Sequence, residues 1–585
     1  MRLQIVRRAV QAEYAGWGAH LHPVLQRAYA ARGVGSALDL DHSLERLLPI
    51  STLAGVAEAV RLLLAHRKRG RVLVIGDFDA DGATSTALMV RAMRAWGFAC
   101  VDFLVPNRFK FGYGLTPEIV EIALTRNPTL IVTVDNGISS VAGVAAARAC
   151  GIEVLITDHH LPGSSLPEAN VIVNPNLLDS RFGSGALAGV GVAFYVMAGV
   201  KRRLDAEHEL SAAALGVAEF LDLVALGTIA DVVPLDFNNR VLISQGLKRI
   251  RAGRCVAGIR ALLQLAGRRT DDLTATDLAF TVAPRLNAAG RIDDMKIGIE
   301  CLLADEDADA LVLAMRLDEL NQERRSIEAR MQTEALAAVQ RLHETSLRPL
   351  HRSGVCLFDE TWHQGVVGLV ASRVKERVRR PVFAFARAED ASLRGSGRSI
   401  VGVHIRDVLD SIAARHPNLI VKFGGHAMAA GLTLDFEKLE RFARAFDEEV
   451  ERCLATSQRT DCIETDGELG VEEIALATAS ALRGGGPWGQ AFPEPTFDGV
   501  FAIRSARIVG ERHLKMWVEV PRSGRTFDAI AFNYVGADGK CALPEGSAQL
   551  IYRLDINEYQ GERRLQLLVD HVLPSPQVAI AARAD

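Results

Sequence analysis

The sequence predicts a multidomain α/β protein: a parallel sheet covered by helices, a long connecting helix, a smaller α/β domain and a C-terminal OB-like barrel. Three observations favour this fold class. The chain has 585 residues, which is more than one hydrophobic core usually serves. In its first third, short apolar runs alternate with helix-like segments, as in a parallel sheet covered on both faces. Near its end, β-like runs follow one another closely, as in a small all-β domain.

The predicted parallel sheet rests on five apolar runs, each closed by polar residues. They are 72–76, 103–106, 130–134, 154–157 and 171–175. Helix-like segments such as 83–97 separate several of them. Residues 1 to about 70 and 185 to 305 are predicted to be largely helical. The segment 311–344 contains neither Gly nor Pro, which predicts one extended helix or a helical pair.

These patterns predict five regions along the chain. They are an N-terminal helical segment (1–45), a catalytic domain (46–305), a connecting helix (306–345), a smaller α/β domain (346–458) and a β-rich C-terminal domain (459–585). The last domain has β-like runs at 499–510, 513–520, 526–534, 548–559 and 563–573. Five strands suit an OB-fold barrel or, equally well, a small β-sandwich. Its aromatic residues Trp517, Tyr534, Tyr552 and Tyr559 are either base-stacking groups or core residues.

Composition sets limits on function and location. The hydrophobic content of 49% is that of an ordinary globular protein. With a net charge of −4 there is no overall basic excess, so a polyanion has to be held by local arginines or by metal. The eight cysteines form no Cys-x-x-Cys pair, which favours a reducing compartment. No long apolar run predicts a secretory signal or a membrane span, so we expect a cytoplasmic protein that does not contact membranes.

Acidic and imidazole side chains follow three of the predicted strands. Asp77, Asp79 and Asp81 come after the first run, and in an extended backbone these alternate residues start on the same side. Asp135 ends the run at 130–134. Asp158, His159 and His160 end the run at 154–157. In open α/β sheets, ligands bind at this carboxyl edge of the strands.

Crowded carboxylates require cations, and oxygen ligands with one or two histidines favour Mn²⁺ or Mg²⁺ over structural zinc. Asp231 lies in an otherwise apolar stretch and, taken alone, is more often a helix cap than a ligand. A calcium-binding EF-hand is excluded, because counting from Asp77 places Leu88 where that loop needs Glu.

A family resemblance rests on many motifs in order. GDFDADG, TVDNG, TDHH and GTIADVVPL resemble the four motifs of the DHH phosphoesterase family. PNRFKFGYGL, PRLNAAGR, WHQGVVGLVASR, GSGRS and GGH resemble the RecJ-type branch, and GPWGQAFPEPTFDGVF extends the likeness toward the C-terminus. The chain is thus similar, over roughly residues 45–435 and beyond, to single-stranded-DNA-specific 5′→3′ exonucleases.

The resemblance implies a two-metal site, with Mn²⁺ or Mg²⁺ as both ions. Asp77, Asp79 and Asp135 would hold the first ion, and Asp81, Asp135, His159 and Asp231 the second. Asp158 would orient a histidine from behind the ligands. Asp81, Asp135 and His160 are the implied catalytic residues, with His160 facing the scissile phosphate.

Substrate-binding candidates come from the same motifs. The arginines offer bidentate phosphate contacts, Ser372 a hydroxyl, and the glycines a close backbone approach. Taken singly, each arginine is more often a surface residue, and His363 is as often a packed structural histidine. The candidates are Arg108, Arg285, His363, Ser372, Arg373, Arg398, Gly424, Gly425 and His426.

The expected function is 5′→3′ exonuclease digestion of single-stranded DNA to 5′-mononucleotides, in DNA repair and recombination. The resemblance implies a single-strand-binding protein and a helicase as partners, and we expect a monomer. Two alternatives remain: a DHH hydrolase of small substrates, and a catalytically inactive scaffold that binds DNA. The RecJ-type arginine motifs argue against the first, and the complete set of acids argues against the second.

Overall fold

The computed structural model describes residues 4–10, 21–107, 111, 113–344, 353–388, 391–456, 462–510, 512–535, 543–559 and 562–574. The chain divides into two compact units. The larger unit contains Arg7–Asn321, Glu464–Val535 and Cys541–Asp585. The smaller unit contains Met1–Val6, Gln322–Ile463 and Gly536–Lys540. Each unit has its own sheet and its own core.

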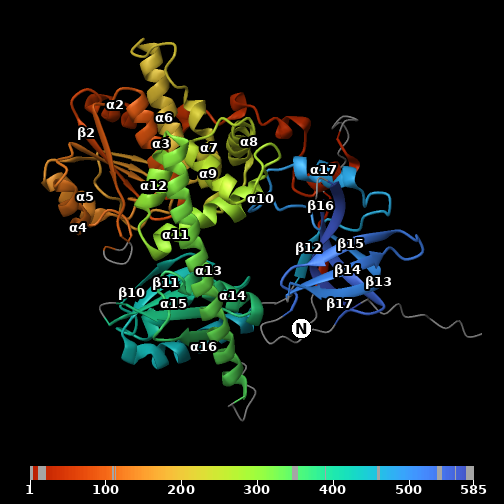
Figure 1. The fold of residues 1–585 in the computed structure, drawn as a ribbon. Helices are drawn as coiled ribbons and strands as arrows, with labels where there is room; N and C mark the ends of the chain where they lie inside the picture. Colours follow the sequence, from red (N-terminus) through yellow and green to blue (C-terminus); the bar gives the residue numbers. More distant parts are fainter. Residues whose placement is uncertain are drawn as a thin grey trace, which may run out of the picture. The chain divides into compact units, whose positions relative to one another are not determined.

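The larger unit is built around a five-stranded, fully parallel sheet (Figure 1). Its strand order is β3-β2-β4-β5-β6. The strands are β2 (Arg71–Gly76), β3 (Cys100–Leu104), β4 (Leu130–Val134), β5 (Glu153–Thr157) and β6 (Val171–Val173). All five predicted runs therefore overlap strands, although β3 ends at Leu104 and β6 at Val173, before the predicted runs end. The chain moves outward from β2 to β3 and then returns to the other side of β2, so the order reverses between β2 and β4.

The alternation of side chains along β2 explains the helices on both faces. Val72 and Val74 pack into the same core as helices α2 (Val56–His66), α3 (Ala80–Ala95) and α6 (Gly189–Ala206). Leu73 and Ile75 face the opposite side and pack with α4 (Pro117–Leu124) and α5 (Val141–Ala149). Because successive side chains point to opposite faces, an all-apolar strand has to be covered twice.

Helices dominate residues 185–305, as expected. They are α7 (Leu221–Ala230), α8 (Phe237–Arg251), α9 (Ala257–Leu265), α10 (Ala275–Asp277), a π-helical turn η5 (Leu278–Val282), α11 (Ala283–Ile292) and α12 (Lys296–Leu303). The connecting segment is one helix rather than two, α13 (Asp307–Glu344).

The smaller unit has a mixed sheet in the order β10-β11-β9-β8-β7. The strands are β7 (Val355–Phe358), β8 (Val382–Arg387), β9 (Leu393–Arg398), β10 (Lys422–Gly425) and β11 (Ala429–Leu434). Phe383 and Phe385 pack against Phe442 and Phe446 of α16 (Leu439–Thr456), with α15 (Ile405–Arg415) in the same core. Helix α14 (Val367–Val378) packs on β8 and β9.

The C-terminal strands close into a barrel in the order β13-β14-β15-β17-β16, which decides for the barrel over the sandwich. They are β13 (Phe497–Val509), β14 (His513–Glu519), β15 (Thr526–Ala531), β16 (Ser547–Tyr559) and β17 (Glu562–Pro574). Tyr552 is buried against Phe497 and Phe501 and belongs to the core, whereas Trp517 on β14 is exposed.

The barrel shares a continuous hydrophobic core with the helices of the larger unit. An aromatic cluster joins them: Trp488 stacks on Phe492 at 5.2 Å between ring centroids, and both lie near Tyr29 of α1 (Pro23–Ala30). The Tyr29 hydroxyl donates to the Gly485 carbonyl at 2.7 Å, just after α17 (Leu476–Gly484). The GPWGQAF motif therefore anchors the barrel to the rest of the unit.

The N-terminal segment differs from the helical prediction. Besides α1 it contains a strand, β1 (Gln4–Arg7), which pairs with β12 (Cys462–Thr465). A run of four residues is too short for its periodicity to distinguish a strand from a helix start. In the described part of the chain, no single helix is long and apolar enough to span a membrane. One bent pair, Leu44–Thr52 with Val56–His66, meets the length and composition test across an 84° bend.

Candidate metal centre

The acidic residues predicted from the strand ends lie together at the carboxyl edge of the parallel sheet, where the strand order reverses. Asp77 follows β2, Asp135 follows β4 and Asp158 follows β5. Asp231 reaches the same place as the residue that ends α7. Four elements thus deliver polar side chains to one switch point, the usual ligand site of an open α/β sheet.

Asp81 lies in a helix, whereas the sequence predicted an extended backbone for the segment that contains it. Asp79 has an extended backbone and is the N-cap of α3, accepting a hydrogen bond from the Gly82 amide at 3.0 Å. Asp81 therefore lies in the first helical turn, not on a strand. Its carboxylate accepts bonds from the amides of Gly189 and Val190 at 2.7 and 2.9 Å, at the start of α6. These bonds fix its orientation and leave lone pairs on both oxygens.

Asp135 has a strained backbone and almost no exposed surface. Its φ is +60°, a conformation that Asp and Asn tolerate better than most residues. A Cβ at Gly189 would come within 2.7 Å of the Asp135 carboxylate, so the start of α6 has to be glycine here. Strain of this kind persists where the surroundings impose it, commonly at functional sites.

Three overlapping sets of ligand atoms lie within 4.8 Å of one another. The sets are Asp77, Asp79 and Asp135; Asp81, His159 and Asp231; and Asp135, His159 and His160. His159 Nε2 is 3.1 Å from Asp135 Oδ1 and 3.5 Å from Asp231 Oδ2. Both the Asp135 Oδ1 and His159 Nε2 atoms are buried without a hydrogen-bond partner among the described residues. These orphaned atoms, together with five carboxylates and two imidazoles, fit divalent cations.

In the metal-free protein, the pKa values of the clustered carboxyl groups indicate that the site lacks positive charge. Burial raises the pKa of Asp231 to about 7, and the charge of Asp79 adds to the shift. Burial and neighbouring carboxylates also raise the pKa of Asp81 and Asp135 well above the ordinary value. Burial lowers the pKa of His159 to about 4, so its ring is a neutral ligand. Bound cations would neutralise the carboxylates that protons otherwise neutralise.

Asp158 lies behind the ligands and holds the DHH segment in shape. Its buried carboxylate accepts from His160 Nδ1 at 2.8 Å and from the amides of Ile138, His159 and His160 at 2.7–3.1 Å. Burial opposes a charge on His160, but the hydrogen bond and charge of Asp158 prevail and raise the pKa of His160 to about 9. His160 is therefore a cation at neutral pH, held by a buried anion.

Tyr113 is a neighbour of this pair that sequence reasoning missed. Its hydroxyl donates to the Asp135 carbonyl at 3.0 Å and lies 3.2 Å from His160 Nδ1. Its ring packs edge-on against His160 and against Phe78, at 5.7 and 6.1 Å between centroids. The signal was present, because Tyr113 belongs to the PNRFKFGYGL motif. Arg108 of the same motif lies outside the described residues.

The PRLNAAGR motif supports the turn that carries Asp77 and Asp79. Asn287 Oδ1 accepts from the Ala80 amide at 2.9 Å, and a Cβ at Gly290 would overlap the Phe78 carbonyl. Sequence reasoning singled out Arg285 in this motif. Its guanidinium is buried, donating to Asp318 at 2.8 Å and to the Thr281 carbonyl at 2.6 Å.

The smaller unit contains the other substrate-binding candidates. His363 Nδ1 accepts from the Gly365 amide at 3.1 Å, just before α14. Ser372 is half-buried on α14, and its neighbour Arg373 is exposed, with Nε 3.2 Å from Glu328 Oε1 of α13. The Arg373 side chain is thus oriented by an acid while most of it stays accessible.

Arg398 and the GGH segment belong to the sheet of this unit. Arg398 donates to Ser396 Oγ at 3.0 Å and the Gly397 carbonyl at 2.8 Å, and a Cβ at Gly368 would come within 2.9 Å of its guanidinium. Gly425 has a φ of +146°, and a Cβ there would overlap the Ala429 carbonyl. A Cβ at Gly424 would meet no described atom within 4 Å, and His426 is exposed.

Comparison with known families assigns three parts of the chain. Residues 71–228 match the DHH family N-terminal domain, 351–452 the DHHA1 domain and 465–571 the RecJ OB domain. The chain is 51% identical to the single-stranded-DNA-specific exonuclease RecJ of Escherichia coli, over 98% of this chain and 99% of that protein. It is 34% identical to RecJ of Thermus thermophilus, over 84% of this chain and 68% of that protein.

Solved structures agree with this assignment. Crystal structures of Thermus thermophilus RecJ in complex with Mn²⁺ and with Mg²⁺ match with TM-scores of 0.80 and 0.75. The sequence identities are 30% and 28%, and each match covers 98% of this chain and 79% of that chain. The parallel-sheet domain, the smaller α/β domain and the barrel are thus those of one known enzyme type. The chain belongs to the RecJ family of single-stranded-DNA-specific exonucleases, metal-dependent hydrolases of the DHH phosphoesterase type.

Proposed function

We propose that this exonuclease digests single-stranded DNA from its 5′ end with two divalent ions and releases 5′-mononucleotides. The observation that carries the two-ion proposal is that two of the three sets of ligand atoms share no residue. Asp77, Asp79 and Asp135 form one set, and Asp81, His159 and Asp231 form the other. One cation has no need of both sets, whereas two cations would use all six side chains, with Asp135 proposed to contribute to both.

The donor atoms determine which ions fit, and the protein holds the side chains that would bind them. Mn²⁺ or Mg²⁺ fits the donors, and the Thermus thermophilus relative has been crystallised with each of these ions. Two such ions supply an activated water and stabilise the attacking and leaving oxygens of the phosphodiester. The protein keeps the ligands oriented, through the α6 amides on Asp81 and the imposed backbone of Asp135.

His160 is proposed to face the scissile phosphate as a cation. Asp158 fixes its Nδ1, so Nε2, which has the Tyr113 hydroxyl 3.5 Å away, is the nitrogen proposed to meet the substrate. Tyr113 packs on the ring and limits its rotation. A fixed imidazolium beside a phosphodiester stabilises the negative charge that builds up as the bond to the leaving oxygen breaks.

The 5′ polarity is proposed to come from a phosphate pocket in the smaller unit. Ser372 and Arg373 on α14 offer a hydroxyl and a guanidinium to a terminal phosphate. Arg108 remains a proposed phosphate contact of the larger unit. A terminal monoester carries about −1.5 to −2 charge against −1 for an internal diester, so such a pocket prefers the strand end. Arg285, His363, Arg398, Gly424, Gly425 and His426 remain proposed contacts to the rest of the strand.

The cellular setting is also part of this proposal. We expect the enzyme to act in the cytoplasm, in DNA repair and recombination, as a monomer. A helicase that exposes single strands and a single-strand-binding protein that coats them are the proposed partners, because each acts on the same substrate.

End-blocked substrates test the proposed polarity. Internally labelled single strands carry a bulky block on the 5′ or the 3′ terminus and are incubated with Mn²⁺. A 5′ block should stop release of mononucleotides, and a 3′ block should not. Digestion that starts at the 3′ terminus rejects the 5′ pocket and leaves the metal proposal standing.

A further inference from the structure

The pairing of β5 with β6 stops just before the two histidines that follow β5. The ladder between these strands reaches the Asp158 amide, which donates to the Val173 carbonyl at 3.1 Å. In this parallel register the next donor from β6 would be Pro175, which has no N–H. The backbone of His159 and His160 therefore has to be held by something other than the sheet.

Two asparagines just beyond β6 supply the missing donors. Asn174 Nδ2 donates to the His160 carbonyl at 2.9 Å, and Asn176 Nδ2 donates to the His159 carbonyl at 2.5 Å. Asn174 is fully buried, and its Oδ1 accepts from the Asn176 amide at 2.7 Å. Because its oxygen faces an N–H and its nitrogen faces a carbonyl, the orientation of this carboxamide is determined. We call Asn174 and Asn176 the asparagine pair.

The asparagine pair holds peptide groups that Asp158 holds from the other side. The peptide between His159 and His160 donates its N–H to Asp158 Oδ1 at 3.1 Å and accepts from Asn176 through its carbonyl. The carbonyl of the following peptide accepts from Asn174. A peptide group is planar, so a partner on each side prevents it from rotating. The backbone torsions that direct both imidazole rings are thereby fixed.

These torsions matter because the two rings reach different partners on the same edge of the sheet. His159 Nε2 lies 3.1 Å from Asp135 Oδ1, and His160 Nδ1 lies 2.8 Å from Asp158 Oδ1. The ring centroids are only 4.5 Å apart. Successive side chains of a strand point to opposite faces, so a continued β5 would separate the rings. The asparagine pair stabilises the irregular backbone that keeps them together.

We propose that the asparagine pair positions the catalytic histidines. Asn176 holds the peptide that joins them and so directs His159 toward the metal site, whereas Asn174 directs His160 toward the scissile phosphate. This inference rests on the proposed function, in which His159 is a metal ligand and His160 faces the substrate. Each asparagine acts through a main-chain carbonyl, so its effect on metal binding and turnover is indirect. A pair that only stabilised the fold would change neither at a given stability.

A glycine leaves the room that the Asn176 side chain occupies. A Cβ at Gly185 would come within 2.9 Å of Asn176 Oδ1. A Cβ at Gly183, two residues earlier, would approach no described atom closer than 3.5 Å, and that atom belongs to Leu48. Both glycines are exposed and neither has a positive φ. Alanine at Gly185 therefore displaces the Asn176 carboxamide, and alanine at Gly183 is its matched control.

Three measurements on the full chain test the asparagine pair. They are Mn²⁺ affinity by titration calorimetry without DNA, kcat and KM on single strands at saturating Mn²⁺, and the melting temperature in chelator. The variants are Asn174→Ala, Asn176→Ala and Gly185→Ala, with Gly183→Ala as one control.

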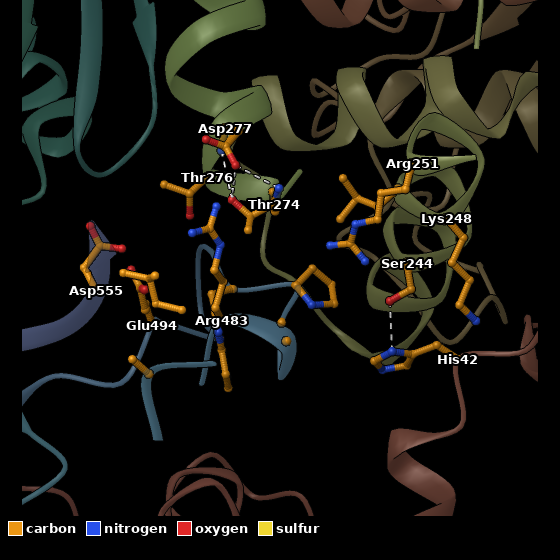
Figure 2. A pocket seen from close by; sticks show the side chains of 18 of the residues that line it. His42, Ser244, Lys248, Arg251, Thr274, Thr276, Asp277, Arg483, Glu494 and Asp555 are labelled. Atoms are coloured by element: carbon orange, nitrogen blue, oxygen red, sulfur yellow. Dashed lines mark hydrogen bonds between the residues drawn. The ribbon is translucent and has the colours of Figure 1, made fainter. Parts of the chain in front are cut away.

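Thr274→Ala controls for the loss of side-chain-to-main-chain bonding elsewhere in the same unit. Thr274 caps α10: its hydroxyl accepts from the Asp277 amide at 3.2 Å and donates to the Asp277 carboxylate at 2.7 Å (Figure 2). Its removal should lower the melting temperature, as the loss of a helix cap usually does, and leave Mn²⁺ affinity and kcat like those of the parent.

Asn176→Ala should weaken Mn²⁺ binding by about tenfold and lower kcat by about tenfold even at saturating Mn²⁺, roughly the effect of one lost hydrogen bond. Asn174→Ala should lower kcat by about tenfold while Mn²⁺ affinity changes less than about threefold, because His160 is not a proposed ligand. KM should change little in either variant. Gly185→Ala should weaken Mn²⁺ binding by about threefold, and Gly183→Ala should match the parent throughout.

Mn²⁺ affinity and kcat like those of the parent in both asparagine variants overturn the positioning role. An equal loss of Mn²⁺ affinity in Thr274→Ala overturns it too, because lower stability then explains every variant. If the asparagine variants do not fold, the glycines decide, and identical behaviour of Gly185→Ala and Gly183→Ala rejects the proposal. Failure of the proposed function is recognised separately: the parent then binds no Mn²⁺, or Asp135→Asn hydrolyses single strands like the parent.

Discussion

Asn287 Oδ1 accepts a hydrogen bond from the Ala80 amide at 2.9 Å. This bond joins α11 to the first residue of α3 and so fixes the turn between Asp77 and Asp81. An asparagine far away in the sequence is thereby a positioning residue for three of the proposed metal ligands.

Asn287→Ala should weaken Mn²⁺ binding and lower kcat, each by about tenfold, because the loss of one hydrogen bond worth about 1 kcal/mol loosens the turn. Titration calorimetry with Mn²⁺ and single-strand hydrolysis measure the two effects.

Asn170→Ala provides the matched control for this substitution. Asn170 Oδ1 accepts from the Val154 amide at the same distance, 2.9 Å, but at the amino end of the sheet. It should lower the melting temperature by a similar amount and leave Mn²⁺ affinity unchanged. If both variants lose metal affinity alike, the effect of Asn287 is one of general stability.

Asp135→Asn should abolish hydrolysis without unfolding the protein, with a loss of at least about a thousandfold in kcat. Asparagine is preferable to alanine here, because it tolerates the φ of +60° at this position. Without metal, the variant should be more stable than the parent, because crowding and burial disfavour the Asp135 carboxylate, whose pKa is raised. Thermal unfolding in chelator measures this gain. Turnover near that of the parent contradicts the bridging role.

Mn²⁺ affinity should rise by at least about tenfold between pH 6 and pH 8, because a proton must leave Asp231, whose pKa is about 7. The folded pKa lies above the ordinary value of 3.8, so the metal-free protein is favoured at low pH and loses this stability as the pH rises through about 7. His159, with a pKa of about 4, is already neutral throughout this range.

The stabilisation by Mn²⁺ should therefore be larger at pH 8 than at pH 6, measured as the shift in melting temperature. In Asp231→Asn the pH dependence of affinity should become less steep, since one of the protons that the metal displaces is absent. If Mn²⁺ affinity depends on pH as steeply in the variant as in the parent, the titrating group is not Asp231.

Arg373→Ala should slow digestion of 5′-phosphorylated strands far more than that of 5′-hydroxyl strands. The exposed guanidinium, oriented by Glu328, is proposed to contact the dianionic terminal phosphate, and a hydroxyl end offers no such charge. The comparison is the ratio of kcat/KM for the two strand ends. Arg444→Ala, an exposed arginine paired with Glu440 in the same unit, should leave the ratio unchanged. A proportional loss on both substrates removes Arg373 from the pocket.

The sequence was sufficient to predict the strands and the carboxylate edge, for a physical reason. A strand buried on both faces is a continuous apolar run, and the residue at its end, such as Asp135, is placed by the sheet itself. Asp81 shows the limit, because its position depends on where α3 begins, and the Asp79 cap sets that point rather than any apolar pattern.

Contacts between distant segments were beyond prediction. Tyr113 and Asn287 reach the centre from segments with no strand of their own, and their partners are main-chain atoms, which no side-chain pattern reveals. The strand β1 was missed because its partner β12 lies at the other end of the chain. The family motifs nevertheless contained both missed side chains.

Trp517 and Tyr552 should behave oppositely when replaced by alanine. Trp517 is 52% exposed on β14, where stacking of one base contributes about 1–3 kcal/mol. Trp517→Ala should therefore raise Kd and KM for long strands by about tenfold, with kcat and the melting temperature little changed. Tyr552 is 1% exposed against Phe497 and Phe501, so Tyr552→Ala should cost about 3–5 kcal/mol of stability.

Point substitutions are the right test of the barrel, because its strands share a core with the helices around the metal centre. Removing the residues after 460 would expose that core and confuse binding with folding. Unfolding by denaturant identifies the stability effect of Tyr552→Ala, and anisotropy with a labelled strand identifies the binding effect of Trp517→Ala. If Trp517→Ala binds long strands as tightly as the parent, the exposed face of β14 is not where bases stack, and the barrel contributes to the enzyme by packing.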